Sequence, residues 1–193
     1  MATPSRETKR PKRMREGNYL PTPSEAEHIQ VLRAKLLDQE DFQFYHLVCD
    51  DFRKGIIAQV VADTLVVCQR LLQLKTDIRC QFYWDNQQFP DGEVEYGQAT
   101  GDSNDLFISL NTFGYVNLPA IRDVMKVVQD TTVHEAAHLY VMLRYPEVSR
   151  HYEQSKELEE TFCDLFEQEY DRMRSVQQRA KVSRNAYRRS VGQ

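Results

Sequence analysis

The chain has 193 residues, of which 41% are hydrophobic, and a formal net charge of −4. This is enough for one globular core with tails, whereas no membrane-length apolar span, N-terminal signal stretch, repeat or glycine-rich phosphate loop occurs. A membrane protein and a phosphate-loop nucleotide binder are therefore not expected. Four cysteines are scattered without a C-x-x-C pair, namely Cys49, Cys68, Cys80 and Cys163. We expect an intracellular protein, nuclear or cytoplasmic, with reduced thiols.

Charge is unevenly distributed along the chain. Residues 17–171 carry 12 basic against 27 acidic residues, whereas the first 16 residues and the segment after residue 171 are basic. The run from Lys9 to Arg15 resembles a nuclear-localisation signal, and a solvated disordered tail is the alternative. The first 16 residues contain no aromatic residue and the basic segment after residue 171 contains only Tyr187, so we do not expect nucleic-acid binding. A protein partner that docks on the basic tails remains open.

The residue pattern predicts an α+β fold that is mainly helical. Ser24 and Glu27 form a predicted capping box that opens the first helix. In chain order we expect a helix to about residue 38, a helix over 43–74, a strand over 78–84, a strand over 106–111, a helix over 119–144 and a helix over 154–188. We divide the chain into a disordered basic tail (1–23), one domain (24–175) and a basic helical extension (176–193).

The most informative motif is an uninterrupted H-E-x-x-H at residues 134–138. At about 100° per residue, His134 and His138 lie on one helical face and can reach one metal ion. The run from Val133 to Leu143 is otherwise apolar, so this helix should be buried. Burying two histidines and Glu135 costs several kcal/mol unless partners are supplied, and a metal would supply them. The alternative is an ordinary helix whose histidines are hydrogen-bonded to the backbone or to carboxylates.

A second acidic motif, E-x-x-x-D, follows at Glu160 to Asp164. Together the two motifs resemble the gluzincin metallopeptidases, the family that includes thermolysin. The resemblance implies a zincin-like domain with a small sheet, in which an edge strand precedes the H-E-x-x-H helix. It also implies that His134, His138 and Glu160 bind Zn²⁺, while Asp164 holds a ligand histidine by its other ring nitrogen.

The apolar residues of this second helix predict how it faces the core. The expected stripe consists of Leu158, Phe162, Leu165, Phe166 and Met173. Glu160 and Asp164 point away from that stripe, so a solvated acidic face is the alternative. Glu159 lies nearer the stripe and is the second candidate for the third ligand, although its i+4 partner, Cys163, is a poor orienting group.

His151 is a further candidate for the third ligand, because Spartan and SprT proteases use a histidine at a similar distance. Those families place a glycine next, whereas this chain has Tyr152. A metzincin is excluded, since Arg144 stands where its third histidine would fall. His151 and Tyr152 remain candidate donors to the oxyanion of a transition state.

The resemblance implies zinc-dependent hydrolysis of peptide bonds in a peptide or protein substrate. Glu135 would take a proton from the attacking water and return it to the leaving amine. Extended substrate would pair along the strand at 106–111. The alternatives are a catalytically idle zinc-binding interaction protein of the same fold and a Spartan-like protease using His151.

Overall fold

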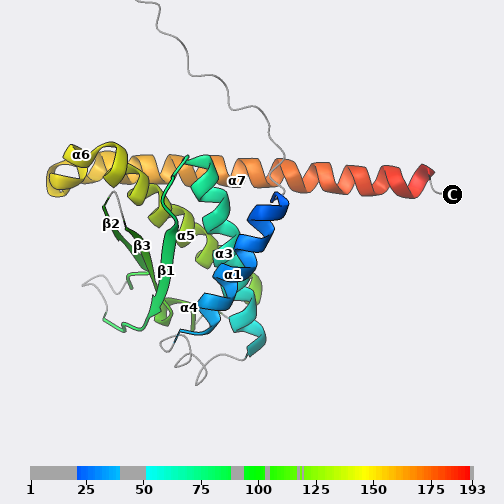
Figure 1. Ribbon diagram of the computed structural model, residues 1–193, viewed down its shortest axis with the longest axis horizontal. Helices are drawn as coiled ribbons and strands as arrows, with labels where there is room; N and C mark the ends of the chain where they lie inside the picture. Colours follow the sequence, from blue (N-terminus) through cyan, green and yellow to red (C-terminus); the bar gives the residue numbers. More distant parts are fainter. Residues whose placement is uncertain are drawn as a thin grey trace, which may run out of the picture.

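The computed structural model describes residues 21–39, 51–87, 94–102, 105–116, 118 and 120–191. It is an α+β fold, mostly helical, with one three-stranded sheet (Figure 1). The elements are α1 (Pro23–Leu37), α3 (Asp51–Leu71), β1 (Ile78–Tyr83), β2 (Gly97–Gly101), β3 (Leu106–Asn111), α4 (Phe113–Val116), α5 (Ile121–Arg144), α6 (Pro146–Arg150) and α7 (Tyr152–Val191). The predictions for residues 1–20 and for residues 43–50 fall outside the described residues.

Helix α1 begins with a capping box two residues earlier than predicted. The hydroxyl of Thr22 accepts from Glu25 N at 3.2 Å, and Glu25 accepts from Thr22 N at 2.7 Å. Pro23 follows directly as the first helical residue, where its missing N–H has no helical partner to lose. The prediction that Ser24 and Glu27 form the box was wrong, because proline fixes the helix start one residue upstream of Ser24.

The sheet has the order β1-β3-β2, so β3 is its central strand. β3 pairs in parallel with β1 and antiparallel with β2. The prediction that residues 106–111 form an edge that could receive substrate was therefore wrong, because hydrogen bonds to neighbouring strands occupy both sides of β3. The two edge strands are β1 and β2, and of these β2, from the segment 97–101, packs against α5.

One face of the sheet is buried against helices. β1 and β3 turn alternate side chains into the core, among them Phe82, Ile108 and Leu110. Helices α3 and α5 pack against each other, and α5 also lies against β2 and β3. The amide of Gln39, just after α1, donates to Cys80 O at 2.7 Å and accepts from Phe82 N at 3.0 Å. It thereby ties the end of α1 to the outer edge of β1.

Asn111, the last residue of β3, organises the chain on both sides of the sheet end. Its amide nitrogen donates to Asp85 O and to Glu95 O, each at 2.8 Å. Its amide oxygen accepts from Asp85 N and Phe113 N, each at 3.1 Å. Asn111 is buried, and these four bonds satisfy its side chain and fix the approach to β2.

Helix α7 runs continuously across the predicted boundary at residue 175, and Figure 1 shows its C-terminal part extending past the rest of the fold. Its first half packs on α5. The predicted apolar stripe was right for Met173, which is buried, and for Phe166 and Phe162, which pack against the core and against Tyr140. It was wrong for Leu158, which is 65% exposed, and for Leu165, which is 59% exposed. Among the side chains of α7 that the structure describes, the buried ones are Glu159, Cys163, Tyr170 and Met173, which recur at helical spacing. This rotation brings Glu159 inside and leaves Glu160 at the border of the α5 contact.

Two further features concern the described part of the chain. None of its helices combines the length and apolar character needed to cross a membrane. The cysteines Cys68, Cys80 and Cys163 are free and buried, as reduced thiols would be.

Candidate metal centre

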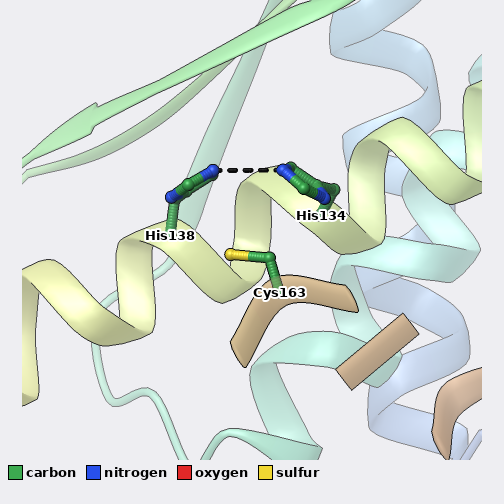
Figure 2. A group of neighbouring side chains, drawn as sticks. All are labelled: His134, His138 and Cys163. Atoms are coloured by element: carbon green, nitrogen blue, oxygen red, sulfur yellow. Dashed lines mark hydrogen bonds between the residues drawn. The ribbon is translucent and has the colours of Figure 1, made fainter. Parts of the chain in front are cut away.

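The two histidines of the pentad stand one turn apart on α5, which is buried along its pentad as expected. Their Nε2 atoms lie 3.1 Å apart, and the rings meet edge to face with centroids 4.8 Å apart. Figure 2 shows both rings on the same side of α5 with these nitrogens facing each other. The helical spacing alone produces this meeting, because residues i and i+4 are neighbours on one face.

The other nitrogen of each ring is held by a carboxylate of α7. Nδ1 of His134 lies 2.6 Å from Oε1 of Glu167, and Nδ1 of His138 lies 2.7 Å from Oε1 of Glu159. An ionised carboxylate can only accept hydrogen bonds, so in both neutral rings the hydrogen is on Nδ1. Each Nε2 then carries an unshared electron pair, and the two pairs face each other.

The carboxylate of Glu160 is a third acceptor near the two facing Nε2 atoms. Its Oε2 lies 3.2 Å from Nε2 of His134, and its Oε1 lies 3.9 Å from Nε2 of His138. Ligand atoms bound tetrahedrally at about 2.0–2.1 Å from one zinc ion are about 3.3 Å apart. Two of the three separations between these groups, 3.1 and 3.2 Å, are close to that value, and the third is 3.9 Å. Electron-rich atoms this close repel one another unless a proton or a metal cation lies among them.

The pKa of His134 reflects the negative charge gathered here. Burial acts to lower the pKa, but the hydrogen bond that His134 donates to Glu167 and the charges of Glu135, Glu167 and Glu160 outweigh it and raise the pKa to about 8. The centre therefore favours an added positive charge, which in the absence of metal would be a proton on the ring.

Glu135 is the buried carboxylate of the pentad, and it faces β2. A Cβ added to Gly97 would lie 3.2 Å from Oε1 of Glu135 and 2.7 Å from Cγ2 of Thr131, so β2 approaches α5 closely at this point. Burial raises the pKa of Glu135 to about 7, with Glu160, Glu95 and Glu167 adding to the effect and His134 opposing it. A carboxylate with such a pKa can accept a proton near neutral pH and give it up again.

Glu159 combines two unusual properties. It is 2% exposed, and its Oε2 is buried without a hydrogen-bond partner among the described residues. Buried carboxylates are costly unless charge or hydrogen bonds compensate them. The single bond to His138 compensates one oxygen, and a nearby cation would compensate the group as a whole.

Asp164 differs from its expected position. It is exposed, and one of its oxygens lies within 4.8 Å of ligand atoms of His134 and Glu167. The gluzincin resemblance implies that Asp164 holds a ligand histidine, whereas Nδ1 of His134 donates to Oε1 of Glu167 and Nδ1 of His138 donates to Oε1 of Glu159. Glu167 was not among the site residues expected from the sequence, and Glu159 was expected only as the second candidate for the third ligand. The signal for both is that Glu159 and Glu167 lie four residues before and four residues after Cys163, on one face of α7.

The two other predicted site residues lie at the junction of α6 and α7. His151 is exposed; its N–H donates to Val148 O at 3.2 Å and its carbonyl accepts from Gln154 N at 2.8 Å. Tyr152 begins α7, and its side chain lies outside what the structure describes. The contacts of His151 are those of a helix end.

Cys163 lies at the centre as well, on the buried side of α7. The ligand atoms of His134, His138 and Cys163 all lie within 4.8 Å of one another. Burial, together with the surrounding carboxylates of Glu160 and Glu159, raises the pKa of this thiol above its usual range. Without a bound cation it is therefore a thiol and not a thiolate.

Comparison of the chain with protein-family models, curated proteins and solved structures gives no match in any of the three. The geometry of the donor atoms is thus the observation from which a function can be argued.

Proposed function

We propose that the chain is a zinc-dependent peptidase of gluzincin type, with His134, His138 and Glu160 as the protein ligands of the ion. The supporting observation is that Nε2 of His134 lies 3.1 Å from Nε2 of His138 and 3.2 Å from the Glu160 carboxylate, which lies 3.9 Å from Nε2 of His138. Nδ1 of each histidine is already engaged by another carboxylate. Nitrogen and carboxylate donors in this ratio fit a catalytic zinc site, which keeps one position open.

The donor set also argues for the choice of third ligand. Glu160 lies 3.2 Å from Nε2 of His134, whereas His151 is exposed at a helix junction. Glu159, the second candidate, is engaged with Nδ1 of His138, on the side of the ring away from the converging atoms. We therefore assign Glu160 as the ligand in preference to both, which disfavours a Spartan-like site.

Glu135 supports hydrolysis rather than a purely structural role for the ion. A zinc ion in this position would polarise a peptide carbonyl and acidify a water molecule. Glu135, buried against β2 with a pKa of about 7, would take the proton from the attacking water and pass it to the leaving amine. A structural site would have no use for a buried base at this place.

The edge strand β2 gives the substrate a place beside Glu135. β2 is hydrogen-bonded to β3 in the sheet and lies against α5. An extended peptide that paired with the other side of β2 would run past Glu135 and the converging donors. The proposed substrate is accordingly an extended or unfolded polypeptide segment.

Metal content is the first test of this proposal. The purified full-length protein should contain about one zinc per chain by mass spectrometry, and both His134→Ala and Glu160→Ala should lose it. His151→Ala, the matched control at the competing histidine, should keep it. A wild-type protein without metal after zinc loading would refute the peptidase proposal, and loss of zinc in His151→Ala alone would restore the Spartan-like alternative.

A further inference from the structure

Cys163 is the one strong zinc-donor side chain at the described centre to which the proposed reaction gives no task. It follows Glu160 by three residues, so both lie on the side of α7 that meets α5. Its side chain is fully buried, and its sulfur lies within 4.8 Å of ligand atoms of both histidines. Figure 2 shows the sulfur of Cys163 below the dashed line that joins the two imidazole rings.

We propose that Cys163 is a fourth protein ligand of the ion, which closes the centre and holds the protein in a latent form. This inference rests on the proposed function, because it concerns the same ion. With Cys163 bound, the ion has two nitrogen donors, one oxygen donor and one sulfur donor. With Cys163 released, three protein ligands remain and one position is free for water.

The chemistry of the donor set supports this role. Zinc accepts nitrogen, oxygen and sulfur donors, and four protein ligands are typical of closed sites, whereas three are typical of catalytic ones. Closing the site breaks the S–H bond of Cys163, releases the proton to solvent and forms a sulfur–zinc bond. Opening reverses each of these changes, with a water molecule taking the vacated position, so no oxidant or reductant is required.

The position of Cys163 on α7 suggests how the two forms differ. Glu159, Glu160 and Glu167 reach the histidines from the same helix that carries Cys163. A small rotation or shift of α7 against α5 would increase the distance from the Cys163 sulfur to the ion. The longer glutamate side chains would keep their contacts with the histidines. The alternative is that Cys163 is only a small buried residue in the α5–α7 contact.

The test uses the full-length protein loaded with cobalt(II), whose thiolate complexes have a sulfur-to-metal charge-transfer band in the near ultraviolet. Wild type should show this band at one cobalt per chain. Cys163→Ser and Cys163→Ala should bind cobalt without the band. The matched control is Cys68→Ser, another buried cysteine, which lies on α3 and should keep the band.

A second measurement needs no variant and so does not depend on how Cys163 substitutions fold. Wild-type protein loaded with cadmium-113 should give a nuclear magnetic resonance line shifted downfield to the range of sites with one thiolate ligand.

In addition, Cys163→Ser with zinc should hydrolyse an unfolded polypeptide at least several-fold faster than wild type.

The outcomes separate the two proposals. One cobalt per chain with no charge-transfer band in wild type would overturn the role of Cys163 and leave the peptidase proposal intact. No cobalt in wild type would remove both. A band in wild type that persists in Cys163→Ser would also refute the assignment, because another cysteine would then be the ligand.

Discussion

Nδ1 of His138 lies 2.7 Å from Oε1 of Glu159, a carboxylate that is almost completely buried between α5 and α7. This contact fixes the hydrogen of His138 on Nδ1 and turns its Nε2 toward the converging donors. Glu167 does the same for His134. The orientation of both histidines is thus set from α7, the helix that also carries Glu160.

Removing the Glu159 carboxylate should weaken metal binding although Glu159 is not a ligand. We expect Glu159→Ala to lower zinc affinity by about 10–100-fold, because the ring of His138 loses its orienting partner. Glu159→Gln keeps an acceptor oxygen and should lose less. Affinity measured by competition with a chelator tests this, and Glu157→Gln, an exposed neighbour, is the control. Unchanged affinity in Glu159→Ala would contradict the role.

Glu135→Gln should separate metal binding from hydrolysis. The amide cannot accept the proton of water, so kcat should fall by about 10²–10⁴-fold while zinc content stays the same. Turnover of an unfolded polypeptide and zinc content, measured on the same sample, test this prediction. The exposed Glu147→Gln should leave both unchanged. Full activity in Glu135→Gln would remove Glu135 from the reaction.

Gly97→Ala should push β2 away from α5. The new methyl group would lie 2.7 Å from Cγ2 of Thr131, a distance that forces a backbone shift. We expect a loss of about 1–3 kcal/mol in the free energy of unfolding, together with lower activity. Removing that methyl group in the double variant Gly97→Ala, Thr131→Ser should restore part of both.

Gly55→Ala is the matched control, and it should increase the free energy of unfolding where Gly97→Ala decreases it. Gly55 lies inside α3, and its added Cβ would meet only the mobile end of Arg33 at 3.3 Å. Alanine should stabilise the helix by about 0.5–1 kcal/mol. Denaturant unfolding of the two alanine variants tests the pair, and equal destabilisation by both would contradict the close approach of β2 to α5.

The capping residue of α1 can be identified by a direct comparison. Thr22→Ala should reduce the free energy of unfolding by about 1 kcal/mol, because Glu25 N loses its acceptor. Ser24→Ala removes a hydroxyl inside the first turn and should change stability little. A larger loss from Ser24→Ala in thermal or denaturant unfolding would restore the capping box expected from the sequence.

Local sequence patterns predicted where each helix and strand lies better than they predicted which elements pack or pair with each other. The helical spacing of His134 and His138 and the alternation over residues 106–111 depend only on residues close in sequence, and both elements lie where they were expected. The order of the strands depends on partners far apart in the chain. The central position of β3, paired with β1 across 28 residues, could not be read from the alternation of β3 itself.

The orientation of α7 shows a second kind of prediction that its apolar residues alone could not make, namely which face of the helix is buried. The prediction assumed that apolar side chains such as Leu158 and Leu165 face inward, which holds when the opposing surface is apolar. Here α5 presents His134 and His138 to α7, so carboxylates are the favourable partners and Glu159 takes an inner position. The two leucines are exposed as a consequence. The inner face of α7 therefore combines the carboxylates that meet the histidines with apolar residues such as Tyr170 and Met173.

The histidines on α5 and the acidic side chains on α7 that meet them are all supplied after residue 133. On the ribosome, which extends a chain from its N-terminus, α1, α3 and the sheet can therefore begin to pack before any histidine of the centre has a partner. Until Glu167 has emerged, His134 lacks the carboxylate that orients it. Metal capture would then be the last event of folding, and a nascent chain halted before Glu159 would carry the H-E-x-x-H motif without a centre to complete.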